Sequence, residues 1–264
     1  MTGQPSLWIE QTGRGAPLLL IAGLGYSSWC WAGVRQALKP DYRVVTFDNR
    51  GTGRSDKPPA PYSMSMMADD AVRVLDECGL ADAHVIGHSM GGYIAQTLTL
   101  RHPDRVRSLI LVGTSPGGQQ TAPVPAETQA SWRKAATLPP ADYARSTMPR
   151  SFAPGWTEKN PQRFEQFLQQ RLQFPTPAAN WLAQFNACAE HVEQGVKVEA
   201  ILQPTLVIHG TEDGVVPHEN GVLLAQRLPN ARFVSLPGIG HLPYLEDPEG
   251  FYRLAREFLA EQKK

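Results

Sequence analysis

Short apolar runs recur along the chain at intervals that suit a protein of alternating strands and helices. Within most of these runs the apolar positions follow one another directly, as they do in strands that are buried on both faces of a sheet. The runs that predict strands are 18–22, 44–47, 84–86, 108–113, 205–209 and 232–236.

Amphipathic stretches of helical length lie between most of these predicted strands. They cover residues 66–78, 90–101 and 219–228, and residues 248–264 show helical spacing after the last strand. Strands that alternate with helices indicate a mostly parallel, doubly wound sheet that is covered on both faces. The predicted fold class is therefore α/β.

One long interval breaks this alternation. Residues 118–202 contain no convincing buried strand, but they contain helix-compatible segments that are separated by prolines. Because a structureless loop of this length is improbable in a compact domain, the interval predicts an inserted helical cap. The predicted organisation is one globular unit, with core segments 1–117 and 203–264 around a cap at 118–202.

Charge and cysteine content narrow the expected partners and compartment. Lys+Arg and Asp+Glu number 25 each, so no basic field recruits nucleic acid or an anionic membrane, and a small-molecule partner is expected. The three cysteines are odd in number and widely spaced, which favours reduced thiols. No secretory leader pattern or membrane-length apolar run is present. We expect a cytoplasmic protein.

Two glycine-rich stretches invite a nucleotide-binding interpretation that their spacing does not support. In GLGYSS the third glycine of a dinucleotide motif is replaced by Ser28, and after Gly51 and Gly53 the same position holds Asp56. No phosphate-binding GxxxxGK[ST] motif occurs either, so no cofactor is expected. Arg50 and Arg54 in the second stretch are candidates to bind an anionic substrate, the alternative being a solvated turn.

The stretch GHSMG, residues 87–91, fits the motif G-x-S-x-G at the junction of a predicted strand and helix. A tight turn there exposes the Ser89 hydroxyl, and glycines at positions 87 and 91 leave room for the neighbouring chain. The N–H of Met90 lies at the start of the helix, where negative charge is favoured. The alternative is that the glycines merely let the helix pack closely on the strand.

A serine hydroxyl needs a base to act as a nucleophile, and that base needs an orienting partner. His241 follows the last predicted strand in a glycine-rich loop, and Asp213 follows the preceding strand, with Glu212 as the rival acid. Both segments should meet at the carboxyl edge of the sheet. Of the other histidines, 84, 102 and 209 have packing or capping explanations, 88 is expected to point away from the nucleophile, and 191 and 218 are expected on exposed helix surfaces.

Five ordered segments together resemble the α/β-hydrolase fold superfamily over nearly the whole chain. The resemblance implies Ser89 as the nucleophile, Asp213 as the orienting acid and His241 as the general base, without a metal ion or organic cofactor. It further implies an oxyanion hole made by the backbone N–H groups of Leu24 and Met90. The segments are LLLIAGLGYSSWCW, VVTFDNRGTGRSDKP, GHSMGG, PTLVIHGTEDGVVP and LPGIGHLPYLEDP.

The resemblance extends to activity, because the segment order and cap size are similar to those of small bacterial carboxylesterases and lactonases. It implies cleavage of an ester or lactone. The apolar and aromatic composition of the predicted cap, with few charges, favours a small, largely apolar substrate. The alternatives are a carbon–carbon bond hydrolase, a cofactor-free haloperoxidase or perhydrolase, and a ligand receptor with a vestigial triad. One position departs from the family pattern, since Ala22 precedes Gly23 where many relatives have histidine.

The predicted cap carries the aromatic residues expected to shape the substrate site. Of the three tryptophans in this interval, Trp132, Trp156 and Trp181, we expect at least two to belong to the cap's own core.

Overall fold

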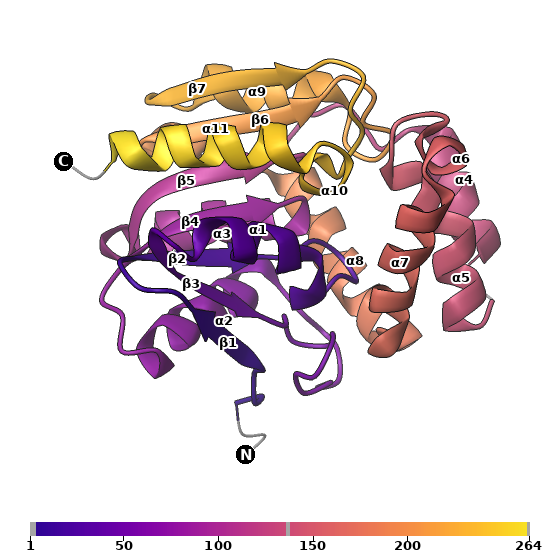
Figure 1. Ribbon diagram of the computed structural model, residues 1–264, viewed down its shortest axis with the longest axis horizontal. Helices are drawn as coiled ribbons and strands as arrows, with labels where there is room; N and C mark the ends of the chain where they lie inside the picture. The colour runs from indigo at the N-terminus through magenta and orange to yellow at the C-terminus, as the bar shows by residue number, and fades with distance from the viewer. Residues whose placement is uncertain (1–3, 136–137, 263–264) are drawn as a thin grey trace.

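The computed structural model describes residues 4–135 and 138–262, and its centre is a seven-stranded sheet (Figure 1). The strand order is β1-β3-β2-β4-β5-β6-β7; β1 pairs antiparallel with β3, and the other pairs are parallel. The α/β class and doubly wound parallel sheet are thus confirmed. The strands are Ile9–Thr12, Ala16–Ile21, Tyr42–Phe47, Ala83–His88, Val106–Val112, Thr205–Gly210 and Ala231–Leu236.

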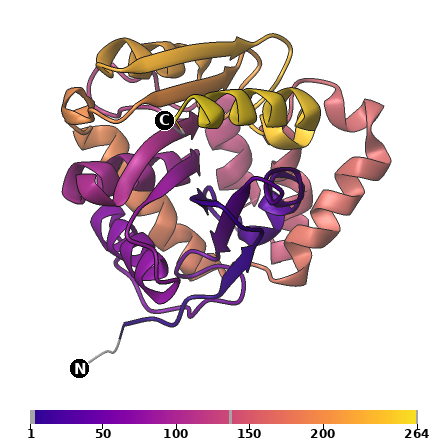
Figure 2. The ribbon, with the colours of Figure 1, turned by 60° about the vertical axis from the view of Figure 1, so that its left-hand side comes forward.

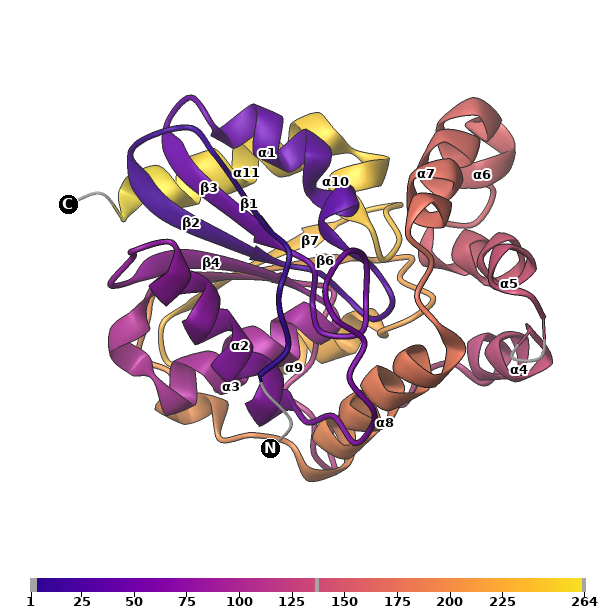
Figure 3. The ribbon, with the colours of Figure 1, turned by 90° about the horizontal axis from the view of Figure 1, so that it is seen from below.

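Helices cover both faces of this sheet, as Figure 3 shows most clearly. One face carries α1 (Ala32–Leu38) and α11 (Pro248–Glu261), and the other carries α2 (Met64–Glu77), α3 (Met90–Arg101) and α9 (His218–Arg227). Each face has its own apolar cluster, because successive strand residues point to opposite sides. Leucines of β2 alternate strictly between the two clusters and are fully buried. The short connecting helices are α10 (Pro243–Glu246), η1 (Ser28–Trp31), η2 (Pro103–Arg105) and η4 (Val198–Ala200).

The chain between β5 and β6 forms the helices that we call the cap. In Figures 1 and 2 these helices gather at one end of the sheet, beyond the carboxyl ends of the parallel strands. A division of the chain at residues 118 and 202 stays a prediction. The cap helices are α4 (Ala126–Ala135), α5 (Pro140–Thr147), η3 (Met148–Ser151), α6 (Trp156–Lys159), α7 (Pro161–Gln173) and α8 (Ala178–Gln194).

Two elements had no clear signal in the sequence. Strand β1 has only four residues and none of them is fully buried, so its pattern is too short and too polar to stand out. Helix α1 is seven residues long, so it lacks the length at which helical periodicity becomes readable. Among the described residues no helix has both the length and the apolar character needed to cross a membrane.

Candidate active site

Ser89 occupies a sharp turn between the end of β4 and the start of α3. Its φ is 55° and its ψ is −120°, and among the described residues it is the one non-glycine residue with positive φ. Such a backbone costs of order 1–3 kcal/mol and persists where the surroundings enforce it. Here the Ser89 N–H donates to Val112 O at 2.9 Å, and the Thr114 hydroxyl donates to Ser89 O at 3.0 Å.

The glycines that flank Ser89 are required by close backbone approaches. A Cβ atom at Gly87 would lie 2.4 Å from the carbonyl oxygen of Gly91, and one at Gly91 would lie 2.1 Å from that of Ile21. Both distances are far inside van der Waals contact with main-chain atoms that cannot move aside. The expectation that these positions exclude side chains is confirmed.

Asp213 and His241 follow adjacent strands, β6 and β7, and their side chains meet at the carboxyl edge of the sheet. The His241 Nδ1 atom lies 2.7 Å from Asp213 Oδ2, and both side chains are buried. Asp213 Oδ1 accepts hydrogen bonds from the N–H groups of Val215 and Val216, each at 2.8 Å. Glu212, the rival acid, is exposed.

A second histidine contacts the same carboxylate. The Nε2 atom of His209 lies 3.1 Å from Asp213 Oδ2 and 2.9 Å from the carbonyl oxygen of Val216. Burial raises the pKa of the Asp213 carboxyl, but the His241 and His209 imidazoles outweigh burial and hold that pKa well below its ordinary value. Asp213 therefore stays ionised and accepts a hydrogen bond from Nδ1 of His241. This leaves Nε2 of His241 as the basic nitrogen.

His88 lies closer to the site than the sequence suggested. Its Nε2 atom is 2.9 Å from the carbonyl oxygen of His241, and its Nδ1 atom is 3.1 Å from the Tyr244 hydroxyl. Burial, with the nearby His241 imidazole, places the pKa of His88 well below its usual value, so this ring is neutral. His88 thus lines the site and supports the backbone of the candidate base.

The loop that carries His241 is held by a carboxylate that no motif indicated. Glu246 is buried and accepts hydrogen bonds from the N–H groups of Gly240 and Ala153, each at 3.0 Å. The N–H of His241 itself donates to the carbonyl oxygen of Ser151 at 3.0 Å. Because Ala153 and Ser151 belong to the interval between β5 and β6, these contacts tie the loop to the cap.

A cavity of about 360 Å³ opens over Ser89 and is lined mainly by apolar and aromatic side chains. His241 and Leu24 also line it, and Arg171 and Glu193 are the Lys, Arg, Asp or Glu side chains among its lining residues. The cavity therefore brings together a hydroxyl, an imidazole and a largely apolar wall.

Two cap tryptophans line this cavity, which corrects the expectation that at least two of three belong to the cap core. Trp132 and Trp181 both face the cavity and lie edge-to-face, with ring centroids 6.4 Å apart. Trp156 instead stacks on Phe152 at 4.5 Å and packs within the cap. A tryptophan in the cap core and one in a cavity wall give the same sequence signal, so the sequence could not distinguish them.

The candidate oxyanion donors lie at the start of α3 and in the loop after β2. Met90 is the first residue of α3, so its N–H has no acceptor within the helix. Leu24 lines the cavity, and its loop is held by the Asn49 amide, which donates to Ala22 O at 3.0 Å.

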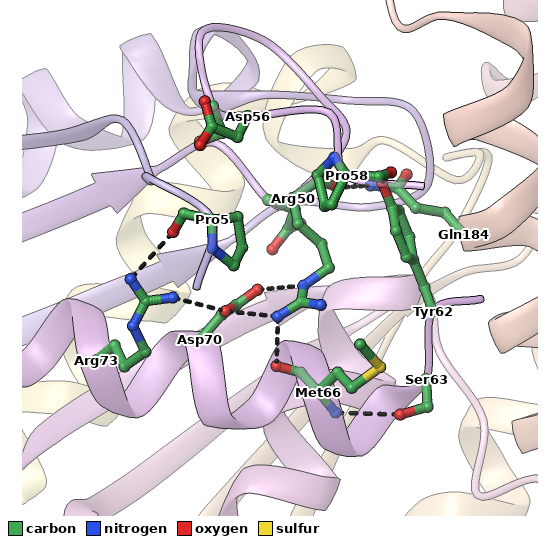
Figure 4. Close-up of polar contacts among 12 residues, drawn as sticks. Pro5, Arg50, Asp56, Pro58, Tyr62, Ser63, Met66, Asp70, Arg73 and Gln184 are labelled. Atoms are coloured by element: carbon green, nitrogen blue, oxygen red, sulfur yellow. Dashed lines mark hydrogen bonds and ion pairs between the residues drawn. The ribbon is translucent and has the colours of Figure 1, made fainter. Parts of the chain in front are cut away.

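Arg50 has a structural partner, contrary to the suggestion that it binds an anionic substrate. Its guanidinium makes two contacts with the buried Asp70 carboxylate, at 2.6 and 2.8 Å (Figure 4). Arg54 lies over the Trp8 ring at 4.1 Å, and neither arginine lines the cavity. His191, expected at an exposed position, is buried and stacks on Tyr93 with ring centroids 4.3 Å apart.

Within residues 4–135 and 138–262, no group of three or more histidine, cysteine or acidic side chains is arranged to hold a metal ion.

Comparison with known proteins identifies the family of this chain. The family model described as the alpha/beta hydrolase fold matches residues 16–248. The chain is 32% identical to a putative carbamate hydrolase RutD of Azorhizobium caulinodans, over 98% of this chain and 97% of that one. It is 32% identical to a 2-hydroxymuconate semialdehyde hydrolase of Pseudomonas putida, over 96% and 90%. A thermophilic esterase from Thermogutta terrifontis superposes with a TM-score of 0.85 at 29% identity, over 98% and 95%.

Proposed function

This chain belongs to the family of hydrolases with the α/β hydrolase fold, and on that premise we propose that it cleaves carboxylic esters or lactones through an acyl-enzyme on Ser89. One observation carries the proposal. Ser89, at its strained turn, and His241 border the same cavity, and His241 is in turn held by Asp213 behind it. The three residues follow the ends of three different strands. Constellations of this kind are recognised by geometry and roles.

In the proposed first step, the Ser89 oxygen attacks the substrate carbonyl carbon while His241 Nε2 accepts the hydroxyl proton. Asp213 keeps the His241 proton on Nδ1 through the 2.7 Å contact and stabilises the imidazolium that forms. The tetrahedral oxyanion accepts hydrogen bonds from the N–H groups of Leu24 and Met90. Loss of one such donor typically costs about a hundred- to a thousandfold in turnover.

In the second half, the leaving alkoxide takes the proton from His241, and the carbon–oxygen bond to it breaks. A water molecule then gives its proton to His241 and attacks the acyl carbon. Collapse of the second tetrahedral intermediate releases the carboxylic acid and returns the proton to Ser89. With a lactone, the alcohol and the acid leave as one molecule.

The cavity supports a small, largely apolar substrate. Its volume of about 360 Å³ lies at the small end of the range for ligand sites, and tryptophans and aliphatic side chains form most of its wall. The proposed cytoplasmic location is supported by the cysteines Cys30, Cys78 and Cys188, which are free thiols, since reducing compartments keep cysteines unpaired.

Two other reactions have specific support from relatives. The match to the putative carbamate hydrolase covers nearly the whole chain, and a carbamate carbonyl, which is less electrophilic than an ester carbonyl, is attacked by a serine hydroxyl in the same way. The similarity to a 2-hydroxymuconate semialdehyde hydrolase supports carbon–carbon bond cleavage as the second alternative. Perhydrolysis and a receptor with a vestigial triad complete the alternatives.

A substrate panel separates these possibilities. Purified enzyme and Ser89→Ala are assayed on p-nitrophenyl esters of increasing chain length, on lactones and on an aryl carbamate. Many turnovers on esters or lactones that vanish in Ser89→Ala support the proposal. A folded wild-type protein that turns over only the carbamate, or nothing at all, refutes it and directs the search to carbamate cleavage, carbon–carbon cleavage or a receptor.

A further inference from the structure

The loop after β2, which carries the candidate oxyanion donor Leu24, is anchored on both sides of that residue. On its strand side the Asn49 amide donates to Ala22 O, as described above. On the far side of Leu24 the N–H of Gly25 donates to Gln184 Oε1 at 3.0 Å.

Gln184 reaches this loop from the cap. It lies on α8, is fully buried, and its amide nitrogen donates to the carbonyl oxygen of Arg50 at 2.9 Å (Figure 4). One side chain thus satisfies both an N–H of the oxyanion loop and a carbonyl of the loop after β3. Arg50 is itself fixed by its contacts with Asp70 of α2, so the far end of this link is rigid.

Other contacts show that α8 and the segment just before it pack on the oxyanion loop. The hydroxyl of Thr176, two residues before α8 begins, donates to the carbonyl oxygen of Gly25 at 3.3 Å. A Cβ atom at Gly25, whose φ is +69°, would lie 2.8 Å from the Trp181 ring. Gly25 is therefore held between the core and the cap at the residue that follows the proposed donor.

We propose that Gln184 is a positioning residue that couples the seating of the cap to the oxyanion hole. The inference rests on the proposed acyl-transfer function. With α8 in place, Gln184 fixes the peptide unit after Leu24, so the Leu24 N–H points at the developing oxyanion. When α8 shifts, Gly25 loses its acceptor and this donor loses its alignment, so turnover requires a seated cap.

The test compares Gln184→Met with Asn180→Leu. Asn180 lies one turn earlier on α8, is buried, and donates to Pro58 O at 3.0 Å and to Tyr62 Oη at 2.7 Å, without contacting the oxyanion loop. Both changes remove a buried amide that ties α8 to the core. Only the first removes the acceptor for Gly25. Asn180→Leu is therefore a matched control for general loosening of the cap.

The readouts are kcat and KM on a p-nitrophenyl ester and the inhibition constant of phenylboronic acid, which forms a tetrahedral adduct with an active serine. We expect Gln184→Met to lower both kcat and boronate affinity by about tenfold to a hundredfold, because misplacement of a catalytic group by about 1 Å has costs of this size. Its KM should change by less than about threefold. Asn180→Leu should stay within about threefold of wild type in all three.

Gln184→Glu provides an independent arm. A fully buried carboxyl that faces the carbonyl oxygen of Arg50 stays protonated, so it keeps both the acceptor for the Gly25 N–H and a donor to Arg50 O. This variant should retain kcat and boronate affinity within about threefold. Provided that wild type is active, three results overturn the inference. They are a tenfold loss of kcat in Gln184→Glu, equal losses of kcat in Gln184→Met and Asn180→Leu, and an unchanged kcat in Gln184→Met. If wild type neither hydrolyses esters nor binds the boronate, the proposed function fails, and this inference fails with it.

Discussion

Replacement of Asp213 by asparagine tests the proposed acid at the atom that holds the base. In the native site Oδ1 accepts two backbone N–H groups at 2.8 Å, and Oδ2 faces His241 Nδ1 at 2.7 Å and His209 Nε2 at 3.1 Å. The asparagine oxygen must keep the two backbone donors, so its NH₂ group faces both imidazoles. His241 can then meet this NH₂ group only with an unprotonated Nδ1, and its proton moves to Nε2.

A proton on Nε2 prevents His241 from accepting the proton of Ser89. The expected loss in kcat is therefore about ten-thousandfold, which corresponds to about 5.5 kcal/mol of transition-state stabilisation. The assay is steady-state hydrolysis of a p-nitrophenyl ester by Asp213→Asn, with circular dichroism to verify folding. Glu212→Gln is the matched control, because Glu212 is the adjacent but exposed carboxylate, and it should retain wild-type activity. A folded Asp213→Asn within tenfold of wild type, or an equal loss in Glu212→Gln, would refute the assignment.

Three further predictions follow from the cavity walls, from burial and from backbone packing. Trp181 lines both the 360 Å³ cavity and a second one of about 310 Å³, so Trp181→Ala should open space for a longer acyl chain. The octanoate-to-butyrate ratio of kcat/KM should rise by at least tenfold, because each buried methylene contributes about 0.8 kcal/mol. An unchanged ratio contradicts this. Burial lowers the pKa of His191 to about 4, whereas histidine in the unfolded chain has a pKa of about 6.5. Between about pH 4 and about pH 6.5 the unfolded state therefore binds more protons than the folded state. The unfolding free energy falls as the pH is lowered from about 6.5 to about 4. In urea titrations at several pH values, His191→Phe should reduce this loss of unfolding free energy by up to about 3 kcal/mol. A mutant whose stability depends on pH in the same way as wild type contradicts the prediction. Gly91→Ala forces a Cβ atom to 2.1 Å from Ile21 O and should lower the unfolding free energy by about 3 kcal/mol, whereas a mutant with wild-type stability would show that the turn tolerates a side chain.

The fold class and the Ser89 turn were readable from the sequence because each depends on local rules. Buried parallel strands give continuous apolar runs, and the close approaches at positions 87 and 91 admit only glycine. Strand β1 was not readable, because it has four partly exposed residues and joins the sheet by antiparallel pairing at its edge. Its place is set by tertiary pairing with β3.

Residues that act through tertiary contacts left little signal. Gln184 lies on a helix with ordinary amphipathic spacing, and its partners are 134 and 159 positions away along the chain. Glu246 likewise acquires its role only where the loop after β7 meets the cap, because it accepts from the N–H of Ala153, 93 positions away. His209 is only four positions from Asp213, but no motif pairs the two residues. The expectation that at least two of Trp132, Trp156 and Trp181 belong to the cap core was wrong, because a tryptophan that packs the cap and one that lines a cavity give the same sequence signal.

The most direct test of the central claim is the intact mass of the protein during ester turnover, followed by peptide mapping. Enzyme mixed with excess p-nitrophenyl acetate is quenched with acid within the first turnovers. We predict a single added acetyl group on the peptide that contains Ser89, and neither the adduct nor turnover in Ser89→Ala. Turnover that persists in Ser89→Ala, or an acetyl group on another residue that forms and decays at the rate of turnover, would contradict the claim.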